Sequence, residues 1–165
     1  MNRFTPSFTA LLVGACFFLA GCGPQKTETA TPPAPAAAGA KVIEITAGDN
    51  MKFNLAEITA APGEEITVAL TNIGTQPKVA MGHNWVLLKK DVDAGAFATA
   101  AMQAQSTEYL PASQQDNVLA HTRLLGAKEK DKVTFKAPAE PGEYVYLCTF
   151  PAHYQMGMKG VLIVR

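Results

Sequence analysis

The chain has 165 residues, of which 48% are hydrophobic and 17% are charged. That length suits one domain with a short additional segment and excludes a large multidomain enzyme. Fourteen Lys and Arg balance fourteen Asp and Glu, and the mean hydropathy is +0.06. The chain is therefore too apolar for a disordered protein and too neutral to bind nucleic acid through phosphate contacts.

The first 21 residues have the composition of a secretory signal peptide. A single charge, Arg3, precedes an apolar run at residues 8–18, which is shorter than the roughly 20 residues needed to cross a bilayer. The run ends at residues 19–22 in LAGC, which resembles the lipobox of bacterial lipoproteins. The resemblance implies cleavage before Cys22 and a diacylglycerol on its thiol. An ordinary signal peptide followed by a chance cysteine is the alternative.

Residues 22–40 are predicted to be an acylated cysteine followed by a tether. Pro, Ala, Thr and Gly dominate this segment, and such a composition cannot bury a core. A folded domain is expected at residues 41–165. Cys16 leaves with the signal peptide and Cys22 carries lipid, so Cys148 is the thiol of the folded domain and no intramolecular disulfide is expected.

The expected domain contains many short segments in which apolar and polar residues alternate, as is typical of β-strands. Gly, Pro and Asn separate these segments, which cover residues 42–46, 51–55, 66–71, 85–88, 132–135, 144–148 and 160–164. Many short strands indicate an all-β sandwich or barrel. The Ala-rich residues 91–105 predict a short helical insertion between strands.

Possible metal ligands lie close together near the C-terminus. Cys148, His153, Met156 and Met158 fall within eleven residues, between two predicted strands, so a short loop can arrange them around one ion. Thiolate and thioether are soft donors, and one Cys, two His and a weak axial Met are the ligands of blue copper electron-transfer sites. The sequence therefore predicts one copper ion and requires a second histidine.

His83 is the best candidate for that second imidazole because it opens a predicted strand. It follows Gly82, whose missing side chain allows the backbone carbonyl to approach a metal. The third histidine, His121, has no other possible ligand at a useful spacing. We therefore expect His121 to lie outside the site.

Three stretches, residues 81–87, 118–126 and 148–160, closely resemble azurins, and the similarity extends over residues 42–164. The resemblance implies an eight-stranded Greek-key cupredoxin β-sandwich with one mononuclear copper ion. It implies that the equatorial ligands are His83, Cys148 and His153, with the Gly82 carbonyl as a weak axial contact opposite a methionine.

Two residues beside the ligands have expected supporting roles. Asn84 is expected to join the two ligand loops. The backbone amide of Phe150 is expected to donate toward the Cys148 sulfur and to raise the reduction potential.

The axial ligand is a choice between two methionines, because the ligand loop departs from the azurin pattern. Azurins have three residues between the loop histidine and the methionine, whereas four separate His153 from Met158 and two separate it from Met156. We favour Met158, because residues 158–160 match the family's Met-Lys-Gly and because this longer spacing is that of auracyanins and rusticyanin. Met156 is the alternative.

The resemblance implies an electron carrier with an apolar docking surface. His153 is expected to expose its ring edge as the electron port, surrounded by Met81, Pro151, Ala152 and Met156, with Tyr154 nearby. Expected partners are c-type cytochromes, quinol-oxidising complexes, oxidases or periplasmic reductases, small interfaces being suited to brief encounters. We expect a monomer.

The expected location is the cell envelope. The membrane would be contacted through lipid on Cys22, with the domain in the periplasm or on the outer cell surface. Gly23 rather than Asp follows Cys22, which permits sorting to an outer membrane.

Two other classes of protein are weighed against the electron carrier. A copper oxidase or nitrite reductase needs a second metal cluster, yet only His121 is left after His83 and His153. A copper storage protein or chaperone uses exchangeable Met-rich or His-rich ligands, whereas these ligands come from distant strands. We therefore predict that the chain is not an enzyme, and keep copper storage or delivery in the cell envelope as the alternative.

Overall fold

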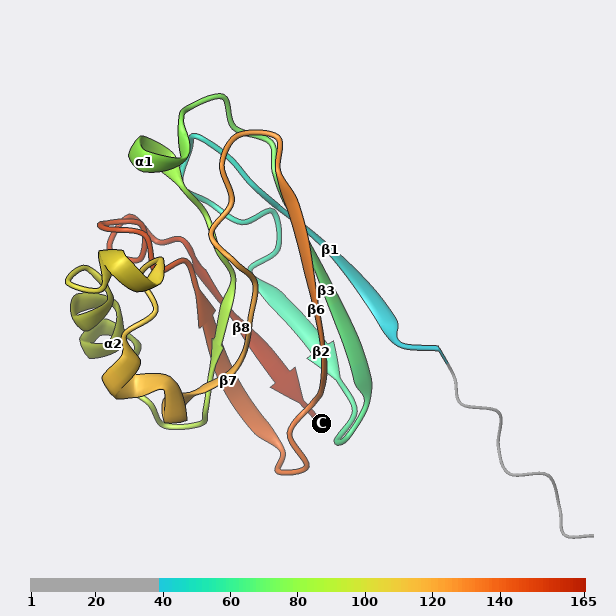
Figure 1. Cartoon of the computed structure of the whole chain (residues 1–165). Coiled ribbons are helices and arrows are strands. Elements are labelled where there is room, and N and C mark those ends of the chain that lie inside the picture. Colours follow the sequence, from blue (N-terminus) through green and yellow to red (C-terminus); the bar gives the residue numbers. More distant parts are fainter. Residues whose placement is uncertain (1–38) are drawn as a thin grey trace, which may run out of the picture. The chain divides into compact units, whose positions relative to one another are not determined.

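Two β-sheets pack face to face in residues 39–165, the part of the chain that the computed structural model describes (Figure 1). The predicted signal peptide and most of the predicted tether lie outside the described residues. One sheet has the order β1-β3-β6, formed by Lys41–Ala47, Glu65–Asn72 and Lys130–Lys136. The other has the order β2-β8-β7-β4-β5, formed by Glu57–Ala60, Lys159–Val164, Gly142–Leu147, Val86–Leu88 and Val118–His121. The predicted all-β sandwich is confirmed.

The core between the sheets follows from the alternation of side chains along each strand. In β3, Ile66, Val68 and Leu70 are fully buried, and each is followed by a half-buried residue. Trp85, just before β4, and Tyr146 of β7 join the same cluster, with ring centroids 5.4 Å apart. This core fixes the sheets from whose ends the candidate ligands project.

The predicted helical insertion is confirmed as α2 (Ala94–Ala101), followed by 3₁₀ turns at Gln105–Thr107 and Ala112–Asn117. The Asp93 side chain caps α2 by accepting hydrogen bonds from the backbone amides of Gly95 and Ala96, at 2.8 and 3.0 Å. Phe97 of α2 packs on the outer face of the five-stranded sheet, which explains why every residue of β4 is buried. None of the helices described is long and apolar enough to cross a membrane.

One strand prediction is wrong, and two strands of the structure were not predicted. Residues 51–55 were expected to form a strand, but Met51 has a left-handed backbone with φ 53° and Phe53 makes only an isolated bridge to Ala47. There the Asn54 side chain takes the place of a strand's backbone carbonyl, because its Oδ1 accepts a 2.7 Å hydrogen bond from the Thr46 amide. The short strands β2 and β5 were not predicted; they form by pairing with β8 and β4.

We predict that Phe97→Ala lowers the free energy of unfolding by about 3–5 kcal/mol, because it empties a fully buried ring site between α2 and the sheet. Urea denaturation of the variant measures this loss. The matched control is Val79→Ala, whose side chain is 86% exposed, with an expected change within about 0.5 kcal/mol. A loss for Phe97→Ala no larger than that of the control would contradict the packing described.

Candidate metal centre

Three side chains with metal-binding atoms, His83, Cys148 and His153, meet where β4 begins and β7 ends. Their ligand atoms all lie within 4.8 Å of one another. His83 comes from the connection between α1 (Lys78–Met81) and β4, whereas Cys148 and His153 come from the connection between β7 and β8. All three are buried. The structure thus brings together the three residues that the sequence singled out.

The backbone around His83 leaves room for no side chain at residue 82. A Cβ on Gly82 would lie 2.8 Å from the Lys78 carbonyl oxygen and 3.0 Å from Leu124 Cγ. Paired hydrogen bonds between the backbones of His83 and Leu125, at 3.1 and 2.7 Å, hold the next residue in place. The Gly82 carbonyl oxygen consequently lies 4.0 Å from the Cys148 sulfur.

The connection between β7 and β8 folds back so that Met158 lies beside Cys148. The Met158 amide donates to the His153 carbonyl at 2.9 Å, and the Cys148 amide donates to the Met158 carbonyl at 3.1 Å. Met158 is fully buried, whereas Met156 is 53% exposed. The two candidate axial methionines therefore occupy different environments, one in the core and one on the surface.

Burial sets the protonation states of the three donors. It lowers the pKa of His83 and that of His153 to about 4, and it raises the pKa of Cys148 to about 12. Near neutral pH both imidazoles are therefore uncharged, and the thiol keeps its proton when no metal is bound. Its Sγ lies 3.4 Å from Nδ1 of His153.

The donor set fits a copper ion. Within residues 39–165, both ring nitrogens of His83 are buried without a hydrogen-bond partner, which is costly unless a metal takes the place of that partner. A thiol that can lose its proton to a metal and a buried thioether are soft donors, and neutral imidazole also binds copper well, so this set suits copper.

Asn84 joins the two segments that carry these donors. Its Nδ2 donates to Thr149 Oγ1 at 2.7 Å, and its Oδ1 accepts from the Thr149 amide at 2.9 Å. The backbone amides of Asn84 and Phe150 also donate toward the Cys148 sulfur, which lowers the pKa of the thiol against the larger effect of burial. Asn84 and the Phe150 backbone thus both contact the segments that carry the donors.

A row of aromatic rings that the sequence reasoning missed lies against His153. The Phe150 and His153 ring centroids are 4.7 Å apart, and Tyr109 packs edge-on against Phe150 at 5.1 Å. Tyr109 follows the first 3₁₀ turn after α2, so no local pattern in the sequence links it to the site. His153 was expected to expose its ring edge, but the residue is buried, with 2% exposed, and the rings of Phe150 and His83 lie against it.

The surface near His153 is apolar over several of the predicted residues. Met81 and Pro151 are half-buried, and Ala152 and Met156 are exposed. Val79 on α1 is 86% exposed and was not predicted. Tyr154, in contrast, packs against the α2 cluster, and the Lys159 ammonium lies 4.6 Å from the centre of its ring. Tyr154 thus belongs more to the contact with α2 than to a docking surface.

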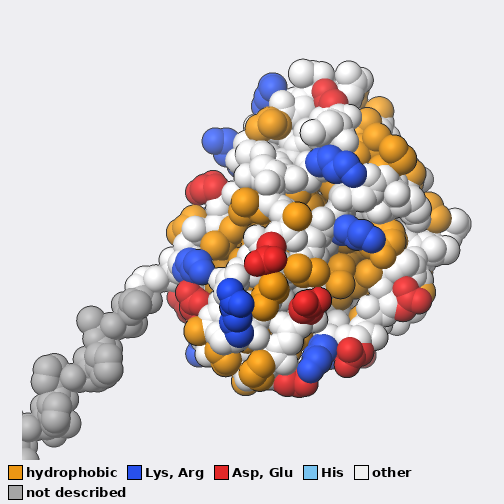
Figure 2. All heavy atoms as spheres, turned by 180° about the vertical axis from the view of Figure 1, so that it is seen from behind, with side chains coloured by type: hydrophobic (Ala, Val, Ile, Leu, Met, Phe, Trp, Pro, Cys, Tyr) orange, Lys and Arg blue, Asp and Glu red, His pale blue; other side chains and the backbone are white. Residues whose placement is uncertain are grey.

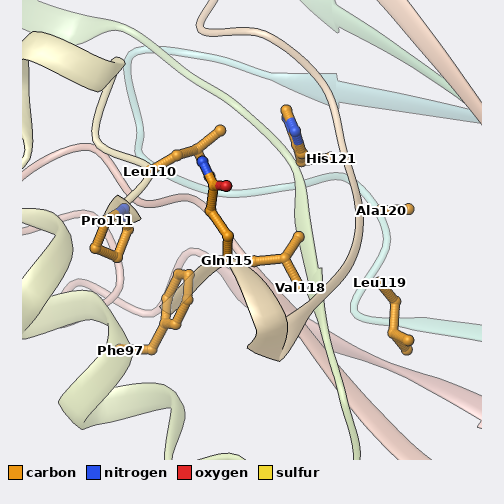
Figure 3. A pocket seen from close by; sticks show the side chains of 8 residues that line it. All are labelled: Phe97, Leu110, Pro111, Gln115, Val118, Leu119, Ala120 and His121. Carbon is orange, nitrogen blue, oxygen red and sulfur yellow. The ribbon is translucent and has the colours of Figure 1, made fainter. Parts of the chain in front are cut away.

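His121 lies apart from the three donors, as expected. It is exposed at the end of β5, beside a cavity of about 280 Å³ that contains none of the candidate ligands (Figure 3). Figure 3 shows the ring of Phe97 and the side chain of Gln115 among the cavity's walls. The residues that line it are Phe97, Leu110, Pro111, Gln115, Val118, Leu119, Ala120 and His121.

A two-sheet sandwich that buries one cysteine, two histidines and a methionine beside the ends of β4 and β7 defines a cupredoxin, a copper-binding β-domain. The chain belongs to the plastocyanin/azurin family of copper-binding proteins, whose family model matches residues 40–165.

Relatives of this chain include azurins and auracyanins. An azurin of Achromobacter denitrificans is 41% identical over 121 residues, covering 72% of this chain and 80% of that protein. Outer membrane protein H.8 of Neisseria meningitidis serogroup B is 32% identical over 171 residues, covering 89% and 92%. Dithionite-reduced auracyanin from Roseiflexus castenholzii has a similar structure, with a TM-score of 0.68 and 41% identity over 77% of this chain and 99% of that one. The chain is a blue copper electron-transfer protein that binds one copper ion.

The buried histidines predict that the copper-free protein loses stability in acid. The pKa values of His83 and His153 are about 4 when folded, below the ordinary value of 6.5, so the unfolded chain binds protons first as the pH falls. The stability that depends on keeping these two histidines uncharged is therefore present above pH 6.5. It is lost as the pH falls from 6.5 to 4. The slope reaches about 1.4 kcal/mol per pH unit for each histidine.

Urea unfolding of the copper-free protein across this pH range measures that slope. His83→Gln leaves one of the two buried histidines, so the slope should fall to about half. A slope that is the same in the variant and in the wild type would show that His83 is not buried in its neutral form.

Proposed function

We propose that His83, Cys148 and His153 would be the main ligands of the copper ion, and that the Met158 thioether and the Gly82 carbonyl would be weaker ligands. The observation that carries this assignment is the buried triad, whose ligand atoms lie within 4.8 Å of one another. The 4.0 Å approach of the Gly82 carbonyl to the Cys148 sulfur supports its placement at the edge of the same site. A copper ion held there supplies one-electron redox chemistry.

Hydrogen bonds within the protein hold these donors in fixed positions. Asn84 fixes the segment of His83 against the segment of Cys148 through two hydrogen bonds, and the backbone bonds of His153 and Met158 fix the loop between them. Donors that cannot move do not follow the different geometries that Cu(I) and Cu(II) prefer. The energy needed to rearrange the site during electron transfer is therefore small.

Met158 is the proposed axial ligand because it alone of the two methionines is buried beside Cys148. Its backbone is hydrogen-bonded to both Cys148 and His153, whereas 53% of Met156 faces solvent. A thioether in a buried position is shielded from water and held at a fixed distance. Met156 is better placed to contact a partner.

We predict that Met158→Ala perturbs the intense blue absorption band and the narrow copper hyperfine splitting of the protein, and shifts its reduction potential, because the axial ligand tunes this class of site. Visible and EPR spectra of the copper-loaded protein, with voltammetry, measure these effects. Met156→Ala is the matched control and should leave all three unchanged. The reverse pattern would assign the axial position to Met156.

We propose that electrons enter and leave beside His153 through the apolar docking surface, which comprises Met81, Pro151, Ala152 and Met156. His153 is the donor nearest to solvent on this loop, and the surrounding side chains can be desolvated at little cost when a partner docks. On the face shown in Figure 2, Lys and Arg are interspersed with Asp and Glu, so no single-sign patch favours a polyanionic partner there. Redox proteins such as c-type cytochromes, quinol-oxidising complexes, oxidases or periplasmic reductases fit this surface, and we propose that the protein acts as a monomer.

The proposed location is the cell envelope, with lipid on Cys22 as the anchor. The sequence LAGC at residues 19–22 supports lipidation, and the name of the Neisseria relative places that protein in an outer membrane. In this proposal residues 1–21 are the signal peptide, residues 22–40 are the tether, and residues 41–165 are the copper domain in the periplasm or on the outer cell surface.

We predict that Cys22→Ala prevents lipid attachment and moves the protein from the membrane fraction to the soluble fraction. Metabolic labelling with a radioactive fatty acid and cell fractionation measure the change. Cys16→Ala, which alters the other cysteine of the N-terminal segment, should leave labelling and location as in the wild type. Lipid label retained by the Cys22 variant would refute the anchor.

We also propose that the chain is a carrier rather than an enzyme or a copper store. His121 is exposed on β5 and stands away from the triad, so residues 39–165 offer no second cluster of His, Cys and carboxylate groups for a substrate-binding metal. Donors buried within the sandwich exchange a metal slowly, which does not suit storage or delivery. Rapid reversible reduction without release of copper would support the carrier, whereas transfer of copper to an acceptor would favour the chaperone.

A further inference from the structure

One lysine from a distant loop holds the segment between His153 and Met158. The Lys52 ammonium donates a hydrogen bond to the carbonyl oxygen of Met156. A Cβ on Gly157 would lie 2.6 Å from Lys52 Nζ, so the ammonium also lies directly against the backbone of that residue. Gly157 has a left-handed backbone, with φ 87°, immediately before Met158.

The rest of this segment is bonded mainly to itself. The Met156 amide donates to Ala152 at 3.0 Å, the Gly157 amide donates to Tyr154 at 2.9 Å, and the Met158 amide donates to His153 at 2.9 Å. Among the described residues, the Lys52 contact is the one hydrogen bond that links residues 154–157 to a distant part of the chain. Lys52 thus supplies the one distant hydrogen bond that positions this turn, beside the packing of Tyr154 against the α2 cluster.

The loop that carries Lys52 is itself fixed to β1 and lies next to the other side of the site. The Lys52 amide donates to Asn50 Oδ1 at 3.2 Å, and Asn54 exchanges hydrogen bonds of 2.7 and 3.1 Å with the backbone of Thr46. At the start of the same loop, the Gly48 backbone lies near enough to the His83 ring to raise its pKa slightly against the larger effect of burial. Lys52 thus connects a loop beside His83 to the loop that carries His153 and Met158.

We propose that Lys52 is a positioning residue: through the Met156 carbonyl and the Gly157 backbone it fixes where the Met158 thioether stands relative to Cys148, His83 and His153. The inference rests on the proposed ligand role of Met158. The Lys52 ammonium has two separable effects in this proposal. Its hydrogen bond orders the turn, and its positive charge favours the reduced ion, which carries one charge less.

Four substitutions in the full chain separate these effects. Lys52→Arg keeps the donor and the charge, Lys52→Gln keeps a donor without the charge, and Lys52→Met keeps neither. Lys41→Met is the matched control, because Lys41 Nζ makes the same kind of bond, 2.7 Å to the Thr59 carbonyl oxygen, at the start of β1 and away from the site.

The first measurement is amide hydrogen exchange in the copper-free protein. Lys52→Met should speed exchange at Gly157 and Met158 about fivefold, the factor that corresponds to a net hydrogen-bond contribution of about 1 kcal/mol. Lys52→Arg should restore slow exchange, and Lys41→Met should leave these two amides unchanged. This measurement does not depend on any bound metal.

The second measurement is the spectrum and reduction potential of the copper-loaded protein. Lys52→Met should perturb the blue band and lower the potential relative to Lys41→Met, Lys52→Gln should lower the potential with the band retained, and Lys52→Arg should match the wild type. A wild-type protein without a blue band would refute the proposed ligand set and leave the exchange result standing.

Two outcomes would overturn the role of Lys52 itself. In a wild type that is blue, unchanged exchange in Lys52→Met would show that the ammonium does not order the turn. Faster exchange with an unchanged spectrum and potential would show that the turn is ordered by Lys52 but does not position Met158. If Lys52→Met fails to fold, as circular dichroism would reveal, the same comparison is made with Lys52→Gln and Lys52→Arg.

Discussion

The two hydrogen bonds between Asn84 and Thr149 join segments 65 residues apart, and the metal centre exists only where these segments meet. Each of these residues is the immediate neighbour of a donor, Asn84 of His83 and Thr149 of Cys148. The sheet register prepares the contact, because Val86 of β4 pairs with Leu147 of β7. Buried hydrogen bonds of this kind contribute only about 0.5–1.5 kcal/mol each, but breaking one leaves its partner unsatisfied, so the geometry is strongly preferred.

The burial that fixes the donors also lowers the folding stability of the copper-free protein. His83 and His153 lose their interactions with water, and the two ring nitrogens of His83 gain no protein partner in residues 39–165. The apolar core of the sandwich, anchored by Ile66, Val68 and Leu70 in β3, supplies the stability that offsets this cost. Metal binding then relieves it, so copper affinity and folding stability are linked in this protein.

The three buried donors could be predicted from the sequence because cysteine and histidine side chains bind metals through their own atoms. Cys148, His153 and Met158 lie on one short loop, and His83 was identifiable from its neighbour Gly82 and from the strand that follows. Asn84 could be assigned only through the resemblance to azurins. The fold class was likewise predictable, since most of its strands alternate clearly between apolar and polar residues.

What the sequence could not provide is contact between segments that are far apart along the chain. Strands β2 and β5 have four residues each, and they exist because β8 and β4 offer them edges to pair with. Tyr109 reaches the site only because the insertion after β4 folds back onto Phe150. Lys52 lies 104 residues from the carbonyl that it binds, in a segment that was expected to be a strand and instead turns sharply at Met51.

The near-complete burial of His153 limits what this residue can offer a partner at the proposed docking surface. With 2% of the residue exposed, a partner gains little from the imidazole alone and must match the apolar side chains around it. Cys148 is fully buried, and away from water the fixed amide dipoles of Asn84 and Phe150 act more strongly on its sulfur. Pro151 and Ala152 of the proposed docking surface belong to the same loop as Cys148 and His153, so a change there can act on the site as well as on docking. A substitution of the half-buried Pro151 that admits water is expected to alter the reduction potential as well as docking.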